Sequence, residues 1–146
     1  MRTKDANGDG KADEVLGGAN LPFGTRPVPY LMNGFIYDDD HTYLVVNEGK
    51  VATVANQQGW KDGLTYIKSL YDAGVIDPAD FTDNADAYSA MGNNATAELY
   101  SAGATLHPWQ FTNCADNASP AYCKDYDPLA PLKGPNSAFG TYIPSS

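Results

Sequence analysis

Residues 5–14 constrain this chain more than any other segment, because they have the spacing of a metal-binding loop. Acidic and amide side chains occupy the first, third, fifth and ninth positions of an EF-hand-type loop: Asp5, Asn7, Asp9 and Asp13. Gly10 occupies the sixth position, where a sharp turn is required, and Lys11 follows it with a backbone carbonyl. A hard cation binds six to eight oxygens, which alternate residues of a tight loop direct inward. The segment therefore predicts a calcium site.

The loop departs from an EF-hand at its last ligand position. An EF-hand has a bidentate glutamate at the twelfth position, where this chain has Leu16. Glu14 is the nearby carboxylate that can complete the coordination shell, so the loop is EF-hand-like. We expect a structural ion, because no methionine-rich groove of the kind that a sensor exposes follows the loop. The alternative is an Asx-rich turn without a metal ion.

Turn-forming residues limit the regular structure available to the rest of the chain. The 146 residues include 14 glycines and 10 prolines, and aspartate and asparagine are abundant, so we expect many loops and few long helices. The net charge of −9, with only 9 lysines and arginines, argues against a nucleic-acid partner. The longest apolar run, residues 43–46, is far shorter than a membrane span.

Two segments have clear patterns of regular structure. Residues 42–47 and 50–54 are β-branched and aromatic runs on either side of a short glycine turn, and they predict a hairpin. Residues 57–73 predict a helix with Asn56 as its N-cap and Gly74 just after its end. Its apolar residues recur with a helical period and predict one buried face: Trp60, Leu64, Ile67, Leu70 and Tyr71.

Weaker patterns predict further elements. We expect a short helix near residues 30–36, a second helix over 84–92 capped by Asp83 or Asn84, and a short strand over 98–102. These elements predict a mixed α/β or α+β unit. The chain then divides into four segments: a calcium loop (1–16), an irregular segment with the hairpin (17–56), helices and a strand (57–113), and a turn-rich tail (114–146).

The two cysteines, Cys114 and Cys123, lie close together in this tail. In an oxidising compartment they would close a short disulfide loop, which stabilises a fold by roughly 2.5–3 kcal/mol. In a reducing compartment they would be two unrelated thiols.

Four blocks resemble, in order and spacing, the bacterial extracellular solute-binding proteins of ABC importers. The first is the calcium loop, including its adjacent Asp13 and Glu14. The second is Glu-Gly-Lys-Val in the hairpin, at residues 48–51, and the third is the helix with its exit, at residues 60–81. The fourth is Pro-Leu-Lys-Gly-Pro-Asn, at residues 131–136. Each block is modest alone, and together they are specific.

The resemblance implies a two-lobed receptor, with residues 1–146 as a single partial domain that lies mainly in the second lobe. The implied fold is α/β, part of a lobe of the type II periplasmic-binding-protein class. It also implies a non-catalytic, extracellular protein, lipid-anchored at full length, that delivers an oligosaccharide or another small solute to a membrane permease. The implied calcium ligands are remote from the solute: Asp5, Asn7, Asp9, the Lys11 carbonyl, Asp13 and Glu14.

Receptors of this kind hold sugars with aromatic faces and polar side chains. The family's second lobe often has a tryptophan soon after the strand that follows its helix pair, and Trp109 stands at about that place. We therefore predict that Trp109 stacks on the sugar, with Gln110 and Tyr88 as neighbours. The alternative is that Trp109 packs in the core, which is where we expect Trp60.

Three consecutive aspartates at residues 38–40 predict a solvated turn, with a second cation site as the alternative. His41 and His107 are expected to be structural, because no spacing places two histidines on one helix face.

Two other functions stay open at the level of the sequence. A module of a secreted carbohydrate-active enzyme would need two carboxylates across a cleft, and the release of reducing sugar would identify it. A calcium-dependent cell-surface adhesion module would bind a second calcium ion.

Overall fold

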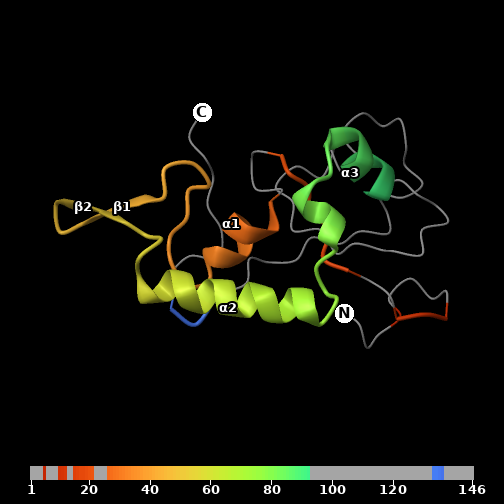
Figure 1. Cartoon of the computed structure of the whole chain (residues 1–146), viewed down its shortest axis with the longest axis horizontal. Coiled ribbons are helices and arrows are strands. Elements are labelled where there is room, and N and C mark those ends of the chain that lie inside the picture. Colours follow the sequence, from red (N-terminus) through yellow and green to blue (C-terminus); the bar gives the residue numbers. More distant parts are fainter. Residues whose placement is uncertain (1–4, 6–9, 13–14, 22–25, 93–132, 137–146) are drawn as a thin grey trace. The chain divides into compact units, whose positions relative to one another are not determined.

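The computed structural model describes residues 5, 10–12, 15–21, 26–92 and 133–136 (Figure 1). Its elements, in chain order, are α1 (Pro27–Met32), β1 (Leu44–Asn47), β2 (Lys50–Thr53), α2 (Gln58–Asp72), the 3-10 helix η1 (Pro78–Phe81) and α3 (Ala85–Gly92). The chain divides into two compact units, Met1–Pro27 with Leu70–Leu129 and Val28–Ser69 with Ala130–Ser146. Each unit is described by itself below. No described helix combines the length and the apolar character needed to cross a membrane.

The predicted hairpin is confirmed. Strands β1 and β2 pair antiparallel, with Val45 opposite Ala52 and Val46 opposite Val51. The turn residues Glu48 and Gly49 have φ angles of 49° and 77°. Two positive φ angles are typical of a type I′ turn, whose twist matches that of the paired strands. The hairpin therefore follows from the local sequence.

Helix α2, Gln58–Asp72, confirms the helix that was predicted over residues 57–73. Gly74 has a φ of 67°. Its N–H donates to the Tyr71 carbonyl at 2.9 Å, and the Val75 N–H donates to the Leu70 carbonyl at 2.9 Å. This pair of bonds is the Schellman motif, so the predicted stop is confirmed. The predicted cap at Asn56 is wrong, because the first helical N–H groups donate instead to the carbonyl of Gln57.

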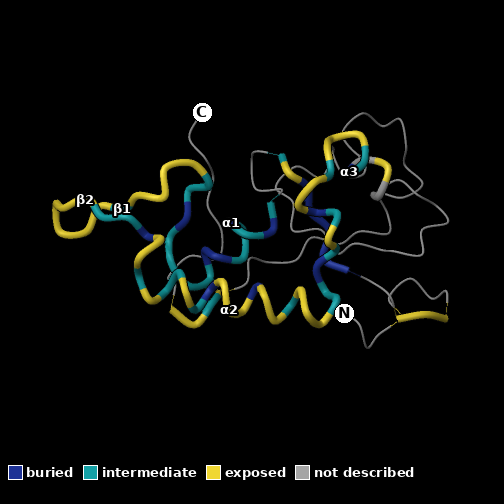
Figure 2. Tube along the Cα trace, viewed as in Figure 1, coloured by how far each residue is buried: buried dark blue, intermediate teal, exposed yellow. Residues whose placement is uncertain are grey.

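The buried face of α2 is rotated from the predicted one. Gly63 and Ile67 are its buried residues, whereas the side chains of Leu64 and Tyr71 are 43% and 44% exposed (Figure 2). A Cβ on Gly63 would overlap the sulfur of Met32 in α1. Because glycine carries no hydrophobic side chain, the apolar pattern missed the position at which Met32 of α1 packs against α2.

Helix α1 begins at Pro27 and ends at Met32, earlier than the predicted 30–36. The core of the unit that contains Val28–Ser69 includes the fully buried side chains of Met32 and Val54, with Ile67. A Cβ on Gly134 would overlap the Gly34 carbonyl, so the backbone of residues 133–136 packs directly on the turn after α1. This contact gives a physical reason for the glycine in the Pro-Leu-Lys-Gly-Pro-Asn block.

In the other unit, the segment of residues 15–21 runs beside the chain that follows α2. The Leu16 N–H donates to the Val75 carbonyl at 2.6 Å, and Leu16 forms a parallel bridge with Ile76. Further on, the Asn20 N–H donates to the Asp83 carbonyl at 3.0 Å. This pairing holds the segment directly after the predicted calcium loop.

Helix α3 confirms the second helix prediction. Asn84 is its cap, because its side-chain Oδ1 accepts the Ala87 N–H at 3.0 Å and its carbonyl accepts the Tyr88 N–H at 3.0 Å. Before it, the Asp77 side chain accepts the Ala79 N–H at 2.9 Å and caps η1, an element that the sequence analysis did not predict. The predicted strand over 98–102 lies outside the described residues.

Candidate functional site

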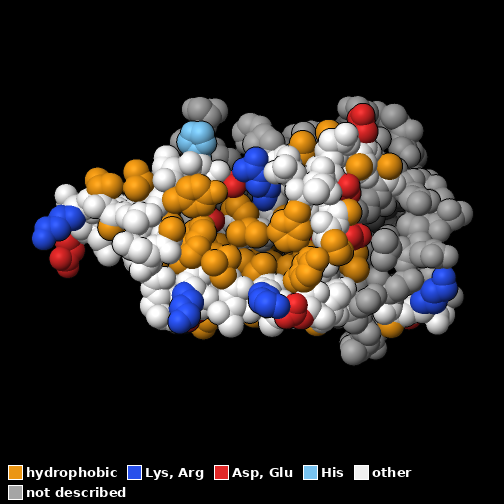
Figure 3. Space-filling model, viewed as in Figure 1, with side chains coloured by type: hydrophobic (Ala, Val, Ile, Leu, Met, Phe, Trp, Pro, Cys, Tyr) orange, Lys and Arg blue, Asp and Glu red, His pale blue; other side chains and the backbone are white. Residues whose placement is uncertain are grey.

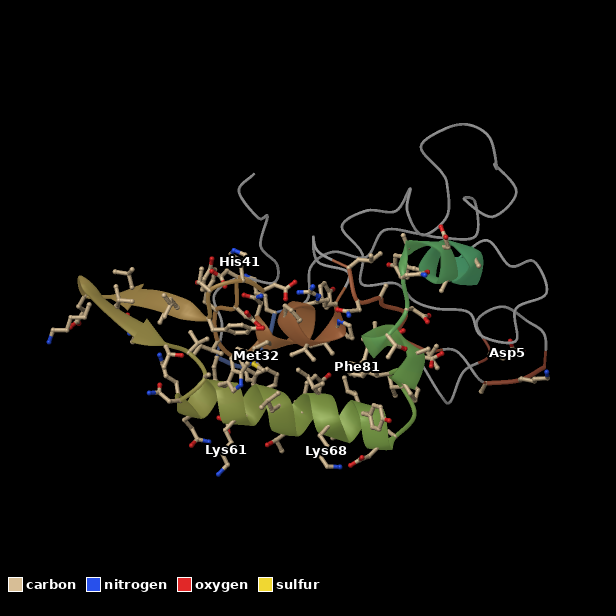
Figure 4. The ribbon with its side chains drawn as sticks, turned by 45° about the horizontal axis from the view of Figure 1, so that its top comes forward. Asp5, Met32, His41, Lys61, Lys68 and Phe81 are labelled. Carbon is tan, nitrogen blue, oxygen red and sulfur yellow. The ribbon has the colours of Figure 1, made fainter. Side chains whose placement is uncertain are left out.

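Part of the predicted calcium loop is described, and its geometry is that of a closed turn. Asp5 Oδ2 accepts the N–H of Gly10 at 2.8 Å, and Gly10 has a φ of 91° (Figure 4). This bond joins the first and sixth positions of the loop, and glycine adopts this φ without strain. The other side-chain ligands lie outside the described residues: Asn7, Asp9, Asp13 and Glu14. The calcium ion therefore stays a prediction.

Of the predicted sugar contacts, Tyr88 lies in the described part of the chain. Tyr88 is fully buried and packs with Ala19, beside the partly buried Leu21. In this structure its ring belongs to a core. Trp109 and Gln110 lie outside the described residues, as do Cys114 and Cys123, so their predicted roles stay predictions.

The loop between α1 and β1 contains the three aspartates at residues 38–40. They are predicted to form a solvated turn, and that prediction is wrong for Asp38. Asp38 is 1% exposed. The Asn33 side chain, which is also buried, accepts the Asp38 N–H at 3.1 Å and donates to the Asp38 carbonyl at 2.8 Å. Burial raises the pKa of the Asp38 carboxyl, and the charges of Asp40 and Asp39 act in the same direction. The loop is therefore ordered from its first residue.

Asp39 organises the rest of this loop. Its Oδ1 accepts the backbone N–H groups of His41, Thr42 and Tyr43 at 3.0, 2.8 and 3.2 Å. Its Oδ2 accepts the Thr42 hydroxyl at 2.5 Å. Partial burial alone would raise the pKa of Asp39, but the hydrogen bonds from Thr42, His41 and Tyr43 outweigh it and lower the pKa to about 2. The carboxylate is thus charged, and it holds three successive amides in place.

The same loop carries two non-glycine residues in the left-handed region. Asp40 has a φ of 57° and Tyr43 a φ of 56°. The ring of Tyr43 is 44% exposed and lies edge-on to the ring of Trp60, with centroids 5.6 Å apart and planes at 82°. Trp60 is partly buried on α2, so its predicted core position is confirmed only in part. We call these two residues the Tyr43–Trp60 corner.

The second-cation alternative for residues 38–40 finds no support in the described residues. Within that part of the chain, no three histidine, cysteine, aspartate or glutamate side chains gather in a way that could hold a metal ion. Asp38 Oδ1 accepts the Asp40 N–H, and Asp39 Oδ1 accepts three backbone N–H groups of the same loop. The aspartates here build a loop.

A further buried carboxyl lies in the other unit, on η1. Asp80 is fully buried. Burial raises the pKa of Asp80 to about 7, with help from the charges of Asp77 and Asp83. Neither oxygen of this carboxyl has a hydrogen-bond partner among the described residues. The sequence gives little indication that Asp80 is buried. It stands three residues after the capping residue Asp77, but aspartates at this spacing are also common on exposed turns.

Comparisons with known proteins connect the chain to one class of receptor. No protein-family model matches it. It is similar to the fructooligosaccharide ABC transporter substrate-binding protein FusA of Streptococcus pneumoniae, with 29% identity over 137 residues. These residues make up 93% of this chain and 23% of FusA.

The fold leads to the same relative. The structure is similar to that of S. pneumoniae FusA in complex with kestose, with a TM-score of 0.61 and 27% identity, over 92% of this chain and 25% of FusA. The chain therefore spans about a quarter of the length of the relative that it matches. The resemblance to solute-binding proteins of ABC importers is confirmed by this relative, and the mixed helices and strands match part of a substrate-binding protein.

Proposed function

We propose that this chain contributes to oligosaccharide capture for an ABC importer and carries out no catalysis. The observation that supports this most is that nearly the whole chain aligns with FusA in sequence and in fold. FusA is named as a fructooligosaccharide-binding protein, and its structure holds kestose. We therefore propose fructose-containing oligosaccharides as the solute class. Neither the secreted-enzyme alternative nor the adhesion alternative has a comparable observation in its favour.

The proposed mechanism is closure of two lobes around the sugar, followed by delivery to a membrane permease. In this proposal Trp109 stacks on a sugar ring and Gln110 bonds its hydroxyls. Because Tyr88 is fully buried in this structure, we assign it to the packing behind the site. An isolated chain that provides one side of a cleft should bind weakly, with a Kd of about 1 mM or higher.

We also propose that a calcium ion stabilises the loop of residues 5–14. The bond from the Gly10 N–H to Asp5 Oδ2 supports this, because it closes the loop at the two positions that define an EF-hand-type turn. Removal of calcium by a chelator should lower the melting temperature, and Asp5→Asn should abolish the difference. A melting temperature that a chelator does not change would contradict the metal site.

The location and partner follow from the same proposal. We propose that the protein works outside the cell, held at the membrane by a lipid anchor, beside the permease that it supplies. Labelling of surface proteins on intact cells with a membrane-impermeant reagent would test this location. A protein that is labelled only after lysis would contradict it.

The test of the function is a titration of the chain with kestose, followed by nuclear magnetic resonance. We expect chemical-shift changes that increase with kestose concentration through the millimolar range, and no comparable changes with sorbitol as the control polyol. Failure of kestose to shift any resonance would refute the proposal. Release of reducing sugar from kestose would replace it with the enzyme alternative.

A further inference from the structure

The Tyr43–Trp60 corner has a feature that the packing of the fold does not require. Tyr43 lies at the foot of the hairpin in a left-handed conformation, with a φ of 56°. For a residue with a Cβ, that conformation is less favourable by about 1–2 kcal/mol, whereas glycine adopts it without strain. Among the described residues, glycine occupies three positive-φ positions, and the other two residues with a Cβ at such positions, Asp40 and Glu48, are polar turn residues. The tyrosine ring therefore stands here at a cost to the backbone.

Several contacts of the main chain hold this conformation. The Tyr43 N–H donates to Asp39 Oδ1 at 3.2 Å, and the Tyr43 carbonyl accepts the Val54 N–H at 2.9 Å. The Asn33 side chain in turn fixes Asp38, directly before Asp39. Both backbone polar groups of Tyr43 are thus tied to fixed parts of the same unit. Strain that the surroundings maintain in this way is typical of functional positions.

Burial of the ring does not offset this backbone strain. Tyr43 is 44% exposed, although its ring contacts that of Trp60 edge-on. Successive side chains of the hairpin lie on alternate faces, and Val46 stands opposite Val51 in the register. Hydrophobic side chains are visible on the surface of the hairpin (Figure 3). The residues before Tyr43, His41 and Thr42, are exposed and polar, and the residue after it, Leu44, is exposed and apolar. An exposed aromatic ring held by its backbone suits the C–H face of a sugar.

We propose that the Tyr43–Trp60 corner is a sugar-contact site, at which the Tyr43 ring stacks on one ring of an oligosaccharide. Its residues differ from the predicted contacts Trp109 and Gln110. The inference rests on the proposed function, since it assumes that an oligosaccharide is the solute. It adds a fixed aromatic contact to those that the sequence predicts.

The test is a kestose titration of the full chain and three variants. Tyr43→Gly removes the ring and keeps a residue that adopts the left-handed conformation, so the loop should persist. Tyr43→Phe keeps the ring. Tyr71→Ala is the matched control, because Tyr71 is also 44% exposed and also lies edge-on to another ring, that of Phe81. The readouts are the Kd and the indole N–H resonance of Trp60, identified by its absence from Trp60→Phe.

We expect the Trp60 resonance to shift with kestose in the wild-type chain, in Tyr43→Phe and in Tyr71→Ala. In Tyr43→Gly the Kd should rise about fivefold to tenfold. Equal binding by the wild type and Tyr43→Gly, with Trp60 unchanged, would overturn this inference and leave the proposed function standing. An absence of kestose binding by every form would overturn both.

Discussion

Replacement of Asp80 by asparagine should stabilise this protein, and by an amount that grows with pH. The Asp80 side chain is fully buried on η1. Burial raises the pKa of Asp80 to about 7, and the carboxylates of Asp77 and Asp83 contribute in the same direction. Asparagine has nearly the same shape and carries no charge, so it removes the cost of ionisation.

The magnitude follows from the difference between the two states. In the unfolded chain the carboxyl ionises near its ordinary value of 3.8, whereas in the folded chain it ionises near 7. Between these values the folded state binds more protons than the unfolded state, so stability falls as pH rises, by at most about 1.4 kcal/mol per pH unit. Above pH 7 the accumulated cost levels off at about 4 kcal/mol, which is an upper bound for the gain from Asp80→Asn.

The assay is urea unfolding of the full chain, at fixed calcium concentration, from pH 5 to pH 8.5. The gain in unfolding free energy for Asp80→Asn should increase up to about pH 7 and then stay constant. The control is Asp86→Asn, which removes an exposed carboxylate from the first turn of α3 and should change stability by a few tenths of a kcal/mol at every pH. A gain for Asp80→Asn that is the same at pH 5 and pH 8 would refute the reasoning.

Three further substitutions test local features of the fold. Asn33→Ala should lower the unfolding free energy by about 2–4 kcal/mol, because it leaves the buried N–H and carbonyl of Asp38 without their partner, and chemical denaturation measures this. Gly134→Ala should cost about 1–3 kcal/mol, because its Cβ would overlap the Gly34 carbonyl; an unchanged melting temperature would contradict that contact. Gly49→Ala should cost about 1 kcal/mol at a φ of 77°, and hydrogen exchange in the hairpin should rise.

The elements that the sequence predicted well are those whose signals are local. The hairpin and the end of α2 each depend on a glycine within a few residues, Gly49 and Gly74, whose positive φ suits the turn. The start of α3 depends on Asn84 in the same way. In each case the residue that forms the turn or the cap stands in or next to the element that it ends or begins. The local sequence pattern was therefore sufficient to predict these features.

The buried face of α2 was predicted less well because it depends on a partner distant in sequence. The periodicity of Leu64 and Tyr71 describes an apolar stripe, but it does not say where a second helix will cross it. Gly63 decides that, because the absence of its side chain lets Met32 approach. A hydrophobicity pattern scores glycine weakly, so the contact that orients the helix is the one that the pattern cannot register.

The loop of residues 38–43 exposes the same limit for polar residues. Three aspartates in a row predict a solvated turn, and the composition gives no reason to separate them. In the structure the first two have different roles. Asp38 is buried and its backbone is hydrogen-bonded to the Asn33 side chain, whereas the Asp39 side chain accepts three backbone N–H groups. The burial of Asp38 depends on an asparagine five residues earlier, to which no sequence motif ties it. Such a network holds Tyr43 in one backbone conformation. A sugar that stacks on Tyr43 would therefore lose little binding free energy to the ordering of its site.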